Sequence, residues 1–315
     1  MRRTVIAALV GAACAAYGAE PFSFGVFGDT PYNGFERQHL PALITEMDAA
    51  PLRFVVHVGD LKSGSERCDD ALYDERLSSF QASHHPFVFV PGDNDWTDCH
   101  RASNGSYAPL ERLARLRQVF FADPRKSLGQ HSMAVDSQAD DAAFAAWPEH
   151  QRWQIGPVLF VTLNVPGSNN NFGRKHAPDE EVVQRSAALE AWIADAFARA
   201  RQDRLQGVVL IQQANPDLED FSAGRPNRAY RDLLEQVVDE TRRFGGEVLL
   251  IHGDSHVHRI DQPLRAPAGG GRVSNFTRLE TFGSPFMGWV RVEVEPDARP
   301  LFRFHAQHYA PGRSN

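Results

Sequence analysis

The stretch Val248-Leu-Leu-Ile-His-Gly-Asp-Ser-His-Val-His258 decides how the rest of the chain is interpreted. Its first four residues form a continuous apolar run, which predicts a strand buried on both faces. The histidines His256 and His258 follow this strand, and α/β proteins place their ligand sites just beyond strand ends. Two imidazoles separated by one residue can point at one place. The stretch therefore predicts a metal site if carboxylates reach that place from elsewhere.

Carboxylates follow three earlier strands of the predicted sheet. The apolar segments 22–27, 53–58 and 86–90 predict buried strands, and each leads into Gly-Asp, the third after one proline. About thirty residues of predicted helix and loop separate one strand from the next, which is the length of a crossover between parallel strands. Because such strands end at one edge of the sheet, the carboxylates that follow them should converge there: Asp29, Asp60 and Asp93.

The remaining chain continues this alternation and predicts an α/β protein. Three further apolar runs predict buried strands: 158–163, 207–211 and 248–251. Amphipathic helices are predicted at 178–203 and 229–243, whereas 290–294 and 301–305 alternate like half-exposed antiparallel strands. The sequence contains no internal repeat and no linker rich in Gly, Pro or Ser, so residues 20–315 are predicted to form one domain.

The composition is typical of a soluble globular protein, with 42% hydrophobic and 23% charged residues among 315. Arg2 and Arg3, a short apolar region and small residues up to Ala19 predict a signal peptide over residues 1–19, in preference to a cytoplasmic helix. Export to the periplasm or the extracellular space follows from that prediction. Nothing else in the sequence is long and apolar enough to span a membrane.

The charge of the mature chain argues against nucleic-acid binding. Removal of the leader takes away two arginines and leaves 31 basic against 40 acidic residues, which is a net charge of −9. An acidic protein is a poor candidate for sequence-independent nucleic-acid binding, because that binding depends on neutralising phosphates.

The three cysteines lead to two expectations. A lipid anchor on Cys14 is not predicted, because Gly11-Ala-Ala13 precedes it where a leucine is expected. Cys68 and Cys99 remain in the mature chain, and in an exported protein they are expected to form a disulfide. The competing interpretation is a pair of thiolate metal ligands, although neither cysteine belongs to a CxxC motif.

The order of these motifs resembles that of the calcineurin-like metallophosphoesterases, whose pattern is D-x-H, GD, GNH[DE], a lone His after a strand, and GHxH. The corresponding blocks are Gly28-Asp29, Gly59-Asp60, Pro91-Gly-Asp-Asn-Asp95, Gln212-Gln213 with Pro216, and Ser255-His-Val-His258. The resemblance covers nearly all of the mature chain. It implies a four-layer α/β/β/α sandwich, two divalent metal ions (Mn, Fe, Zn or Mg) at the strand ends, and hydrolysis of phosphoesters by a metal-bound hydroxide.

The resemblance also implies a set of metal ligands: Asp29, Asp60, Asp93, Gln213, His256 and His258. In this assignment His258 shares a metal with Asp29 and Asp60, and His256 shares the other with Asp60 and Asp93. Taken singly, the acid of each glycine-acid pair could instead serve as a helix N-cap. Three such pairs together with the paired histidines favour the metal site.

Five positions depart from the family pattern, and Ser255 in place of the Gly of GHxH is the mildest change. Pro31 stands where D-x-H has its histidine, Asp93 replaces the Asn of GNH[DE], and Gln213, or Gln212, replaces the lone histidine. Asn94 takes the place of a histidine that stabilises or protonates the leaving group, so it is the expected catalytic position. An amide can donate a hydrogen bond but cannot deliver a proton at neutral pH, so general acid catalysis from this position is lost.

Two functional hypotheses follow. The first is an exported, metal-dependent phosphoesterase that hydrolyses a small phosphomonoester or phosphodiester. The second is a catalytically eroded protein on the same scaffold that binds a metal or an anion without hydrolysis. Losing general acid catalysis slows a reaction by about 100- to 10,000-fold without abolishing it, which leaves the first hypothesis open.

Overall fold

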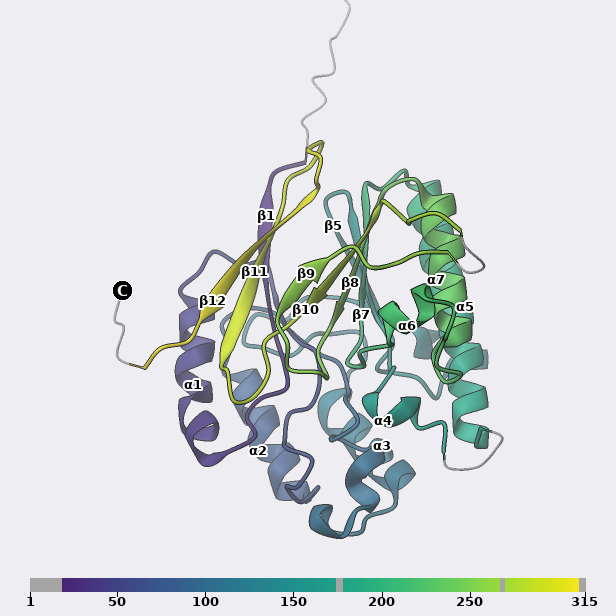
Figure 1. The fold of residues 1–315 in the computed structure, drawn as a ribbon. Helices are drawn as coiled ribbons and strands as arrows, with labels where there is room; N and C mark the ends of the chain where they lie inside the picture. The colour runs from purple at the N-terminus through teal and green to yellow at the C-terminus, as the bar shows by residue number, and fades with distance from the viewer. Residues whose placement is uncertain (1–18, 174–177, 267–269, 312–315) are drawn as a thin grey trace, which may run out of the picture.

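Two mixed β-sheets form the centre of the molecule (Figure 1). The computed structural model describes residues 19–173, 178–266 and 270–311, so the predicted signal peptide lies outside the described residues except for Ala19. The first sheet has the strand order β12 (Phe302–His308), β11 (Gly288–Val294), β1 (Phe22–Phe27), β2 (Val55–His57) and β3 (Phe87–Phe89). The second has the order β4 (Asp136–Ser137), β5 (Gln151–Ile155), β6 (Val158–Thr162), β7 (Gly207–Ile211), β8 (Glu247–His252), β10 (Phe276–Glu280) and β9 (Arg259–Asp261).

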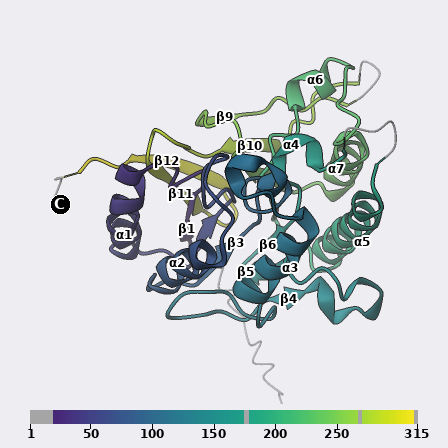
Figure 2. The same ribbon diagram turned by 90° about the horizontal axis from the view of Figure 1, so that it is seen from below.

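The strands that carry the predicted carboxylates are parallel. Val26 of β1 lies opposite Val56 of β2, which in turn lies opposite Val88 of β3. In the second sheet β6, β7, β8 and β10 are parallel as well. β1 runs downward in Figure 1, so the loop after it lies at the lower edge of the molecule, the side that faces the viewer in Figure 2. The short α4 (Gly167–Asn170), which follows β6, lies at the same edge.

Helices cover the outer faces of both sheets, as Figures 1 and 2 show. The first sheet packs against α1 (Gly34–Asp48), α2 (Asp70–Gln81) and α3 (Pro109–Phe120), and the second against α5 (Glu180–Gln202) and α7 (Arg231–Phe244). The short α6 (Leu218–Ser222) precedes α7. Among the described residues, no helix is long and apolar enough to cross a membrane. The arrangement is the predicted α/β/β/α sandwich.

Three hydrophobic layers hold these four structural layers together, one between the sheets and one beneath the helices on each side. β7 shows why its sequence is continuously apolar. Val208 and Leu210 pack toward α5 and α7, whereas Val209 and Ile211 pack between the two sheets. Each such fully buried aliphatic side chain contributes roughly 1.5–3 kcal/mol, so a strand buried on both faces gains from apolar residues at every position.

Some strands are not evident from the sequence. β10 contains Arg278 and Glu280, which are buried charged residues and interrupt the apolar pattern. Arg278 is tolerated there because Asp261 of β9 and Glu219 of α6 form ion pairs with it. The strand predicted at 53–58 is shorter in the structure, with three residues in β2.

Candidate metal centre

The aspartates that follow β1, β2 and β3 lie together at one edge of the first sheet. Asp29, Asp60 and Asp93 are 0%, 3% and 7% exposed. The backbone of Asp29 and of Asp60 is left-handed, with φ of 50° and 58°. Such a conformation costs about 1–3 kcal/mol in a residue other than glycine and is concentrated at functional sites. The loops therefore place these side chains at some cost in stability.

Neutral donors hold the carboxylate of Asp60. The backbone N–H of Asn94 donates to Oδ1 at 3.0 Å, and its side-chain Nδ2 donates to Oδ2 at 2.6 Å. The hydroxyl of Tyr32 donates to the same Oδ2 at 2.7 Å. Gly92 is required here, because a Cβ on it would lie 2.1 Å from Oδ1 of Asp60. Asn94, the expected catalytic position, thus lies directly against Asp60.

Asp95 connects the loops that follow β2 and β3. Its carboxylate accepts hydrogen bonds from the backbone N–H groups of Asp60, Leu61 and Gly92, at distances of 2.7 to 2.9 Å. It is fully buried, and its three partners belong to the loops after β2 and β3. Asp95 therefore joins the two loops and fixes the position of Asp60.

His256 lies beside Asp29, with 3.9 Å between its Nε2 and Oδ1 of Asp29. Its Nδ1 is 2.7 Å from the carbonyl oxygen of Ser284, and because a carbonyl oxygen only accepts, Nδ1 carries the hydrogen and Nε2 presents a lone pair. His258 has the same tautomer, since its Nδ1 lies 2.9 Å from the carbonyl of Glu280. Its ring stacks on Phe282. His256 is thus the neighbour of Asp29 that the structure shows, whereas the sequence interpretation pairs Asp29 with His258.

Asp254, a residue that sequence reasoning missed, occupies the Asp93 side of the site. A Cβ built on Gly167 would lie 2.7 Å from Oδ1 of Asp254 and 2.8 Å from Oδ1 of Asp93, so both oxygens face one point. Gln213 lies at the same place: its Oε1 accepts from the Gly167 N–H at 2.6 Å, and its Nε2 donates to Asp254 at 3.5 Å. The side chain of Gln212 instead donates to the carbonyl of its neighbour Ala214. Gln213 is therefore the glutamine of the site.

A left-handed turn brings Ser168 onto Asp93. Residues 168–171 have φ between 45° and 59°, which explains the Ser-Asn-Asn-Asn sequence, because asparagine tolerates this conformation best after glycine. The hydroxyl of Ser168 lies 2.6 Å from Oδ2 of Asp93 and 3.0 Å from both carboxylate oxygens of Asp98. The other oxygen of Asp93, Oδ1, is buried and has no hydrogen-bond partner among the described residues.

Several carboxylates at this edge of the sheet have raised pKa values because they are buried close to one another. Burial and the neighbouring Asp254 raise the pKa of Asp29 well above its usual value, and burial and Asp93 do the same for Asp60. Burial, again with Asp93, raises the pKa of Asp254 to about 7 and that of Asp98 to about 6. All four shifts have the same two causes, loss of water and repulsion between like charges.

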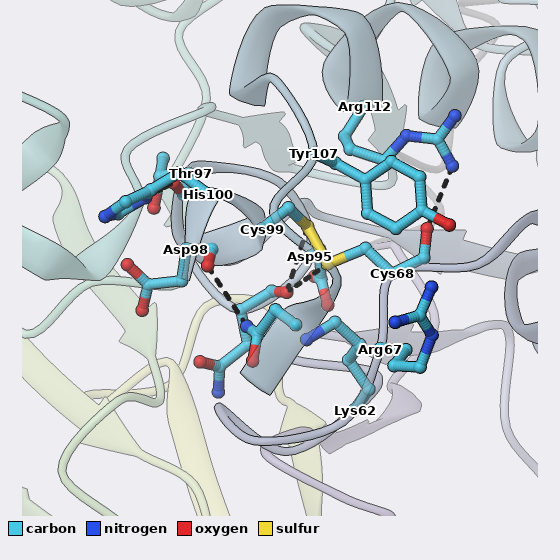
Figure 3. Close-up of a disulfide and its surroundings, with 12 residues drawn as sticks. Lys62, Arg67, Cys68, Asp95, Thr97, Asp98, Cys99, His100, Tyr107 and Arg112 are labelled. Atoms are coloured by element: carbon cyan, nitrogen blue, oxygen red, sulfur yellow. Dashed lines mark hydrogen bonds between the residues drawn. A yellow bond between two sulfur atoms is a disulfide. The ribbon is translucent and has the colours of Figure 1, made fainter. Parts of the chain in front are cut away.

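Three basic side chains lie near these acids but do not neutralise them. Arg101 forms an ion pair with Asp98 at 2.7 Å. The buried amine of Lys62 interacts most strongly with Asp95, whose pKa burial nevertheless raises to about 6. Figure 3 shows Lys62 and Asp95 close to the disulfide. A third cation, the buried Arg76, also interacts with Asp95. Among the described residues, six aspartates therefore outnumber the basic side chains near them: Asp29, Asp60, Asp93, Asp95, Asp98 and Asp254.

The disulfide between Cys68 and Cys99 confirms the expected pairing and excludes thiolate ligands (Figure 3). Both sulfur atoms lie 3.8 Å from the carbonyl oxygen of Asn94, and both cysteines are fully buried. The bond therefore braces the segment that carries Asp93 and Asn94.

The residues present fit a divalent cation. The donor set contains four buried or half-buried carboxylates, one of which is Asp93 with its orphaned Oδ1, and an imidazole nitrogen with a free lone pair. Carboxylate oxygens with few compensating cations are the ligands that Mg²⁺ and Mn²⁺ prefer. Among the described residues, however, no three His, Cys, Asp or Glu side chains converge closely enough to hold a metal by themselves.

Comparison with known proteins supports the fold. No protein-family model matches the sequence, and no curated protein matches it either. Among solved structures, a dimetal phosphatase from Danio rerio has a TM-score of 0.58 at 12% identity, over 91% of this chain and 96% of that chain. PhoD has a TM-score of 0.54 at 12% identity, over 94% and 73%. A purple acid phosphatase from yellow lupin seeds has a TM-score of 0.51 at 10% identity, over 92% and 53%. The chain has the fold of the calcineurin-like metallophosphoesterases.

Three residues of the site were not predicted from the sequence. Tyr32 and Ser168 contact the carboxylates of Asp60 and Asp93, and Asp254 shares the point at Gly167. The Asn-rich run was the one available signal for Ser168, because successive asparagines indicate a left-handed turn.

Proposed function

We propose that the chain is an exported, metal-dependent phosphoesterase that hydrolyses a small phosphomonoester or phosphodiester, with residues 20–315 as its single domain. One observation carries this proposal. Four carboxylates, those of Asp29, Asp60, Asp93 and Asp254, gather with His256 at the strand ends of a fold that is shared with phosphatases. In this proposal two divalent ions would be held by ligands drawn from Asp29, Asp60, Asp93, Gln213, His256 and His258, with water completing their coordination.

A divalent cation at such a site lowers the pKa of water and polarises a phosphoryl oxygen. The chain's own residues position the carboxylates that bind the cation. Asn94 and Tyr32 hold Asp60 by hydrogen bonds, and burial raises the pKa of the Tyr32 hydroxyl, so Tyr32 stays protonated and remains a donor. Asp95 fixes the backbone on both sides of Asp60.

The amide at Asn94 determines which esters the enzyme hydrolyses well. It cannot transfer a proton to the leaving group, and proton transfer is worth about 100- to 10,000-fold in rate. Substrates whose leaving groups need no proton, such as aryl esters, are therefore the preferred class. The rate should depend steeply on the pKa of the leaving alcohol across a series of substituted phenyl and alkyl phosphates. A flat dependence would show that another residue donates the proton.

Export is part of the proposal because of the Cys68–Cys99 bond. Both cysteines are buried beside Asn94, and structural disulfides persist in oxidising compartments outside the cytosol. This agrees with the leader predicted from the sequence.

The proposed activity is tested with residues 20–315 and two aryl substrates, p-nitrophenyl phosphate and bis(p-nitrophenyl) phosphate. Turnover is expected with at least one of Mn²⁺, Mg²⁺, Fe²⁺ or Zn²⁺, and a chelator should remove it. Asp60→Asn should lower kcat by about 100- to 1,000-fold or more, because it removes a buried charge at the reacting centre. Asp239→Asn, at an exposed position on α7, is the matched control and should leave kcat unchanged. Absence of turnover with all four metals would refute the proposal.

A further inference from the structure

We infer that Asp93 and Asp254 form the binding position of one six-coordinate, oxygen-preferring divalent cation, Mg²⁺ or Mn²⁺, which keeps several of its water molecules. The inference rests on the proposed function for the use of a metal at this edge. It adds a ligand, Asp254, in place of an imidazole, and it specifies the class of cation at this position.

The geometry of two oxygens carries the inference. Oδ1 of Asp93 and Oδ1 of Asp254 lie 2.8 and 2.7 Å from the position that a Cβ on Gly167 would occupy, so both oxygens face the same side of the Gly167 Cα, where one cation beside that Cα would contact both. Asp93 is 7% exposed, and its Oδ1 is buried with no hydrogen-bond partner among the described residues. A buried carboxylate oxygen without a partner carries a desolvation cost that a cation would remove.

Hydrogen bonds already occupy the other oxygen of each carboxylate. Oδ2 of Asp93 accepts from the Ser168 hydroxyl at 2.6 Å, and Oδ2 of Asp254 accepts from the backbone N–H of Asn215 at 2.9 Å. Oδ1 of Asp254 has one long contact, 3.5 Å from Nε2 of Gln213. These partners orient both carboxylates with Oδ1 toward the Gly167 point, in the way that outer hydrogen bonds orient metal ligands.

The number and type of donors exclude zinc at this position. Zinc sites use three or four protein ligands, commonly imidazole or thiolate. In the part of the chain that the structure describes, no three His, Cys, Asp or Glu side chains meet at metal-binding distance. Mg²⁺ is commonly held by one or two carboxylates, with water and substrate phosphate completing its octahedron. Asp254 is half-buried, so this position stays open to water and to a phosphate group.

Cation binding is measured by calorimetry at pH 8 on chelator-treated residues 20–315, with MgCl₂, MnCl₂ and ZnCl₂. The parent is expected to bind Mn²⁺ and Mg²⁺. Asp254→Asn is expected to lose one equivalent of Mn²⁺, or to bind it at least about 10- to 100-fold more weakly, which is the loss that even outer partners of a metal cause.

Gly167→Ala tests the position without removing any donor. The backbone of Gly167 needs no left-handed φ, and the added methyl would fill the point between the two oxygens. It should weaken Mn²⁺ binding to the same degree as Asp254→Asn. Gly34→Ala is the matched control, because a Cβ at Gly34 would meet no atom within 4 Å. Circular dichroism of each variant verifies that it is folded. If Gly167→Ala is not folded, the result for Asp254→Asn decides the test.

Three results would overturn the inference. One is the absence of Mn²⁺ and Mg²⁺ binding by the parent, since the two carboxylates would then share a proton instead. Another is unchanged Mn²⁺ binding in Asp254→Asn, and the third is loss of binding in His258→Ala with retention in Asp254→Asn. A different result would refute the proposed function while leaving this inference intact. Mn²⁺ binding that depends on Asp254, without turnover of any phosphoester, would refute the hydrolysis and leave the cation position standing.

Discussion

Glu149 and Asp60 are both carboxylates buried in the interior, yet their pKa values shift in opposite directions. Burial would raise the pKa of Glu149, but the guanidinium of Arg117 at 2.5 Å, helped by Asn164, outweighs burial and lowers it. Asp60 has only the neutral donors Asn94 and Tyr32, so burial and the neighbouring Asp93 raise its pKa. The difference is an ion pair, which Glu149 forms with Arg117 and which Asp60 lacks among the described residues.

Several other buried charges of the molecule follow the Glu149 pattern, although the buried Glu36 accepts only from neutral donors among the described residues. Arg278, with no exposed surface, is paired with Asp261 and Glu219, and Arg185 is paired with Glu181. These structural charges are thus neutralised within the fold. Among the described residues, Asp29, Asp60 and Asp93 form no ion pair with a lysine or arginine, which supports the proposed cation site.

The largest effect is expected from removing the internal cation of Glu149. Arg117→Met leaves this carboxylate buried and unpaired, and we expect a loss of about 3–5 kcal/mol in the free energy of unfolding, measured by urea denaturation. Arg243→Met removes an exposed arginine whose ion pairs with Asp239 and Glu240 are 4.0 and 3.7 Å long. Glu240 keeps Arg201 at 2.5 Å, so the substitution should change stability by less than about 0.5 kcal/mol. Equal effects of the two substitutions would break the comparison.

The disulfide should contribute nearly as much. It joins residues 31 apart, and a loop of this length corresponds to about 3–4 kcal/mol. Cys68→Ala with Cys99→Ala should therefore lower the free energy of unfolding by that amount under oxidising conditions. The parent treated with a reductant should approach the double variant. A loss below about 1 kcal/mol would mean that hydrogen bonds such as those of Asp95 hold the edge without the covalent bond.

The metal-free chain should lose stability as pH rises from about 4 to 7. Unfolded aspartates titrate near pH 4, whereas Asp254 has a pKa of about 7 and Asp95 and Asp98 of about 6 in the folded chain. The folded state therefore binds more protons in this interval, and its stability declines as the pH rises. Saturating Mn²⁺ should remove the decline. Stability that rises through this interval without metal would contradict the raised pKa values.

The smallest effect is a gain. Asp254→Asn removes one of the mutually repelling charges, so in chelator at pH 8 it should raise the free energy of unfolding by about 1 kcal/mol. Asp239→Asn, which alters an exposed carboxylate, should change nothing measurable. A loss of stability in Asp254→Asn would mean that the hydrogen bond from Asn215 stabilises the folded chain more than the repulsion between carboxylates destabilises it.

The first sheet could be predicted from the sequence because its logic is local. Each crossover has the right length, each strand is apolar, and Asp29, Asp60 and Asp93 follow the strands directly. Parallel pairing then brings these three together without further information.

The second half of the site depends on backbone conformations that the residue pattern does not specify. β8 extends to His252, and the left-handed φ of Asp254 (78°) and His256 (58°) turns these two side chains into the site. His258 therefore falls next to β9, beside Glu280. The sequence interpretation matched the histidines of GHxH to His256 and His258, and of these two His256 lies 3.9 Å from Asp29 in the structure.

The free energy of unfolding of residues 20–315 at pH 8, measured in chelator and again in saturating Mn²⁺, tests most directly whether an external cation completes the strand-end carboxylates. Binding at a Mn²⁺ concentration 100 times Kd should add about 2.7 kcal/mol to the stability of the folded chain. Identical stability in the two buffers would contradict the presence of a cation site at this edge.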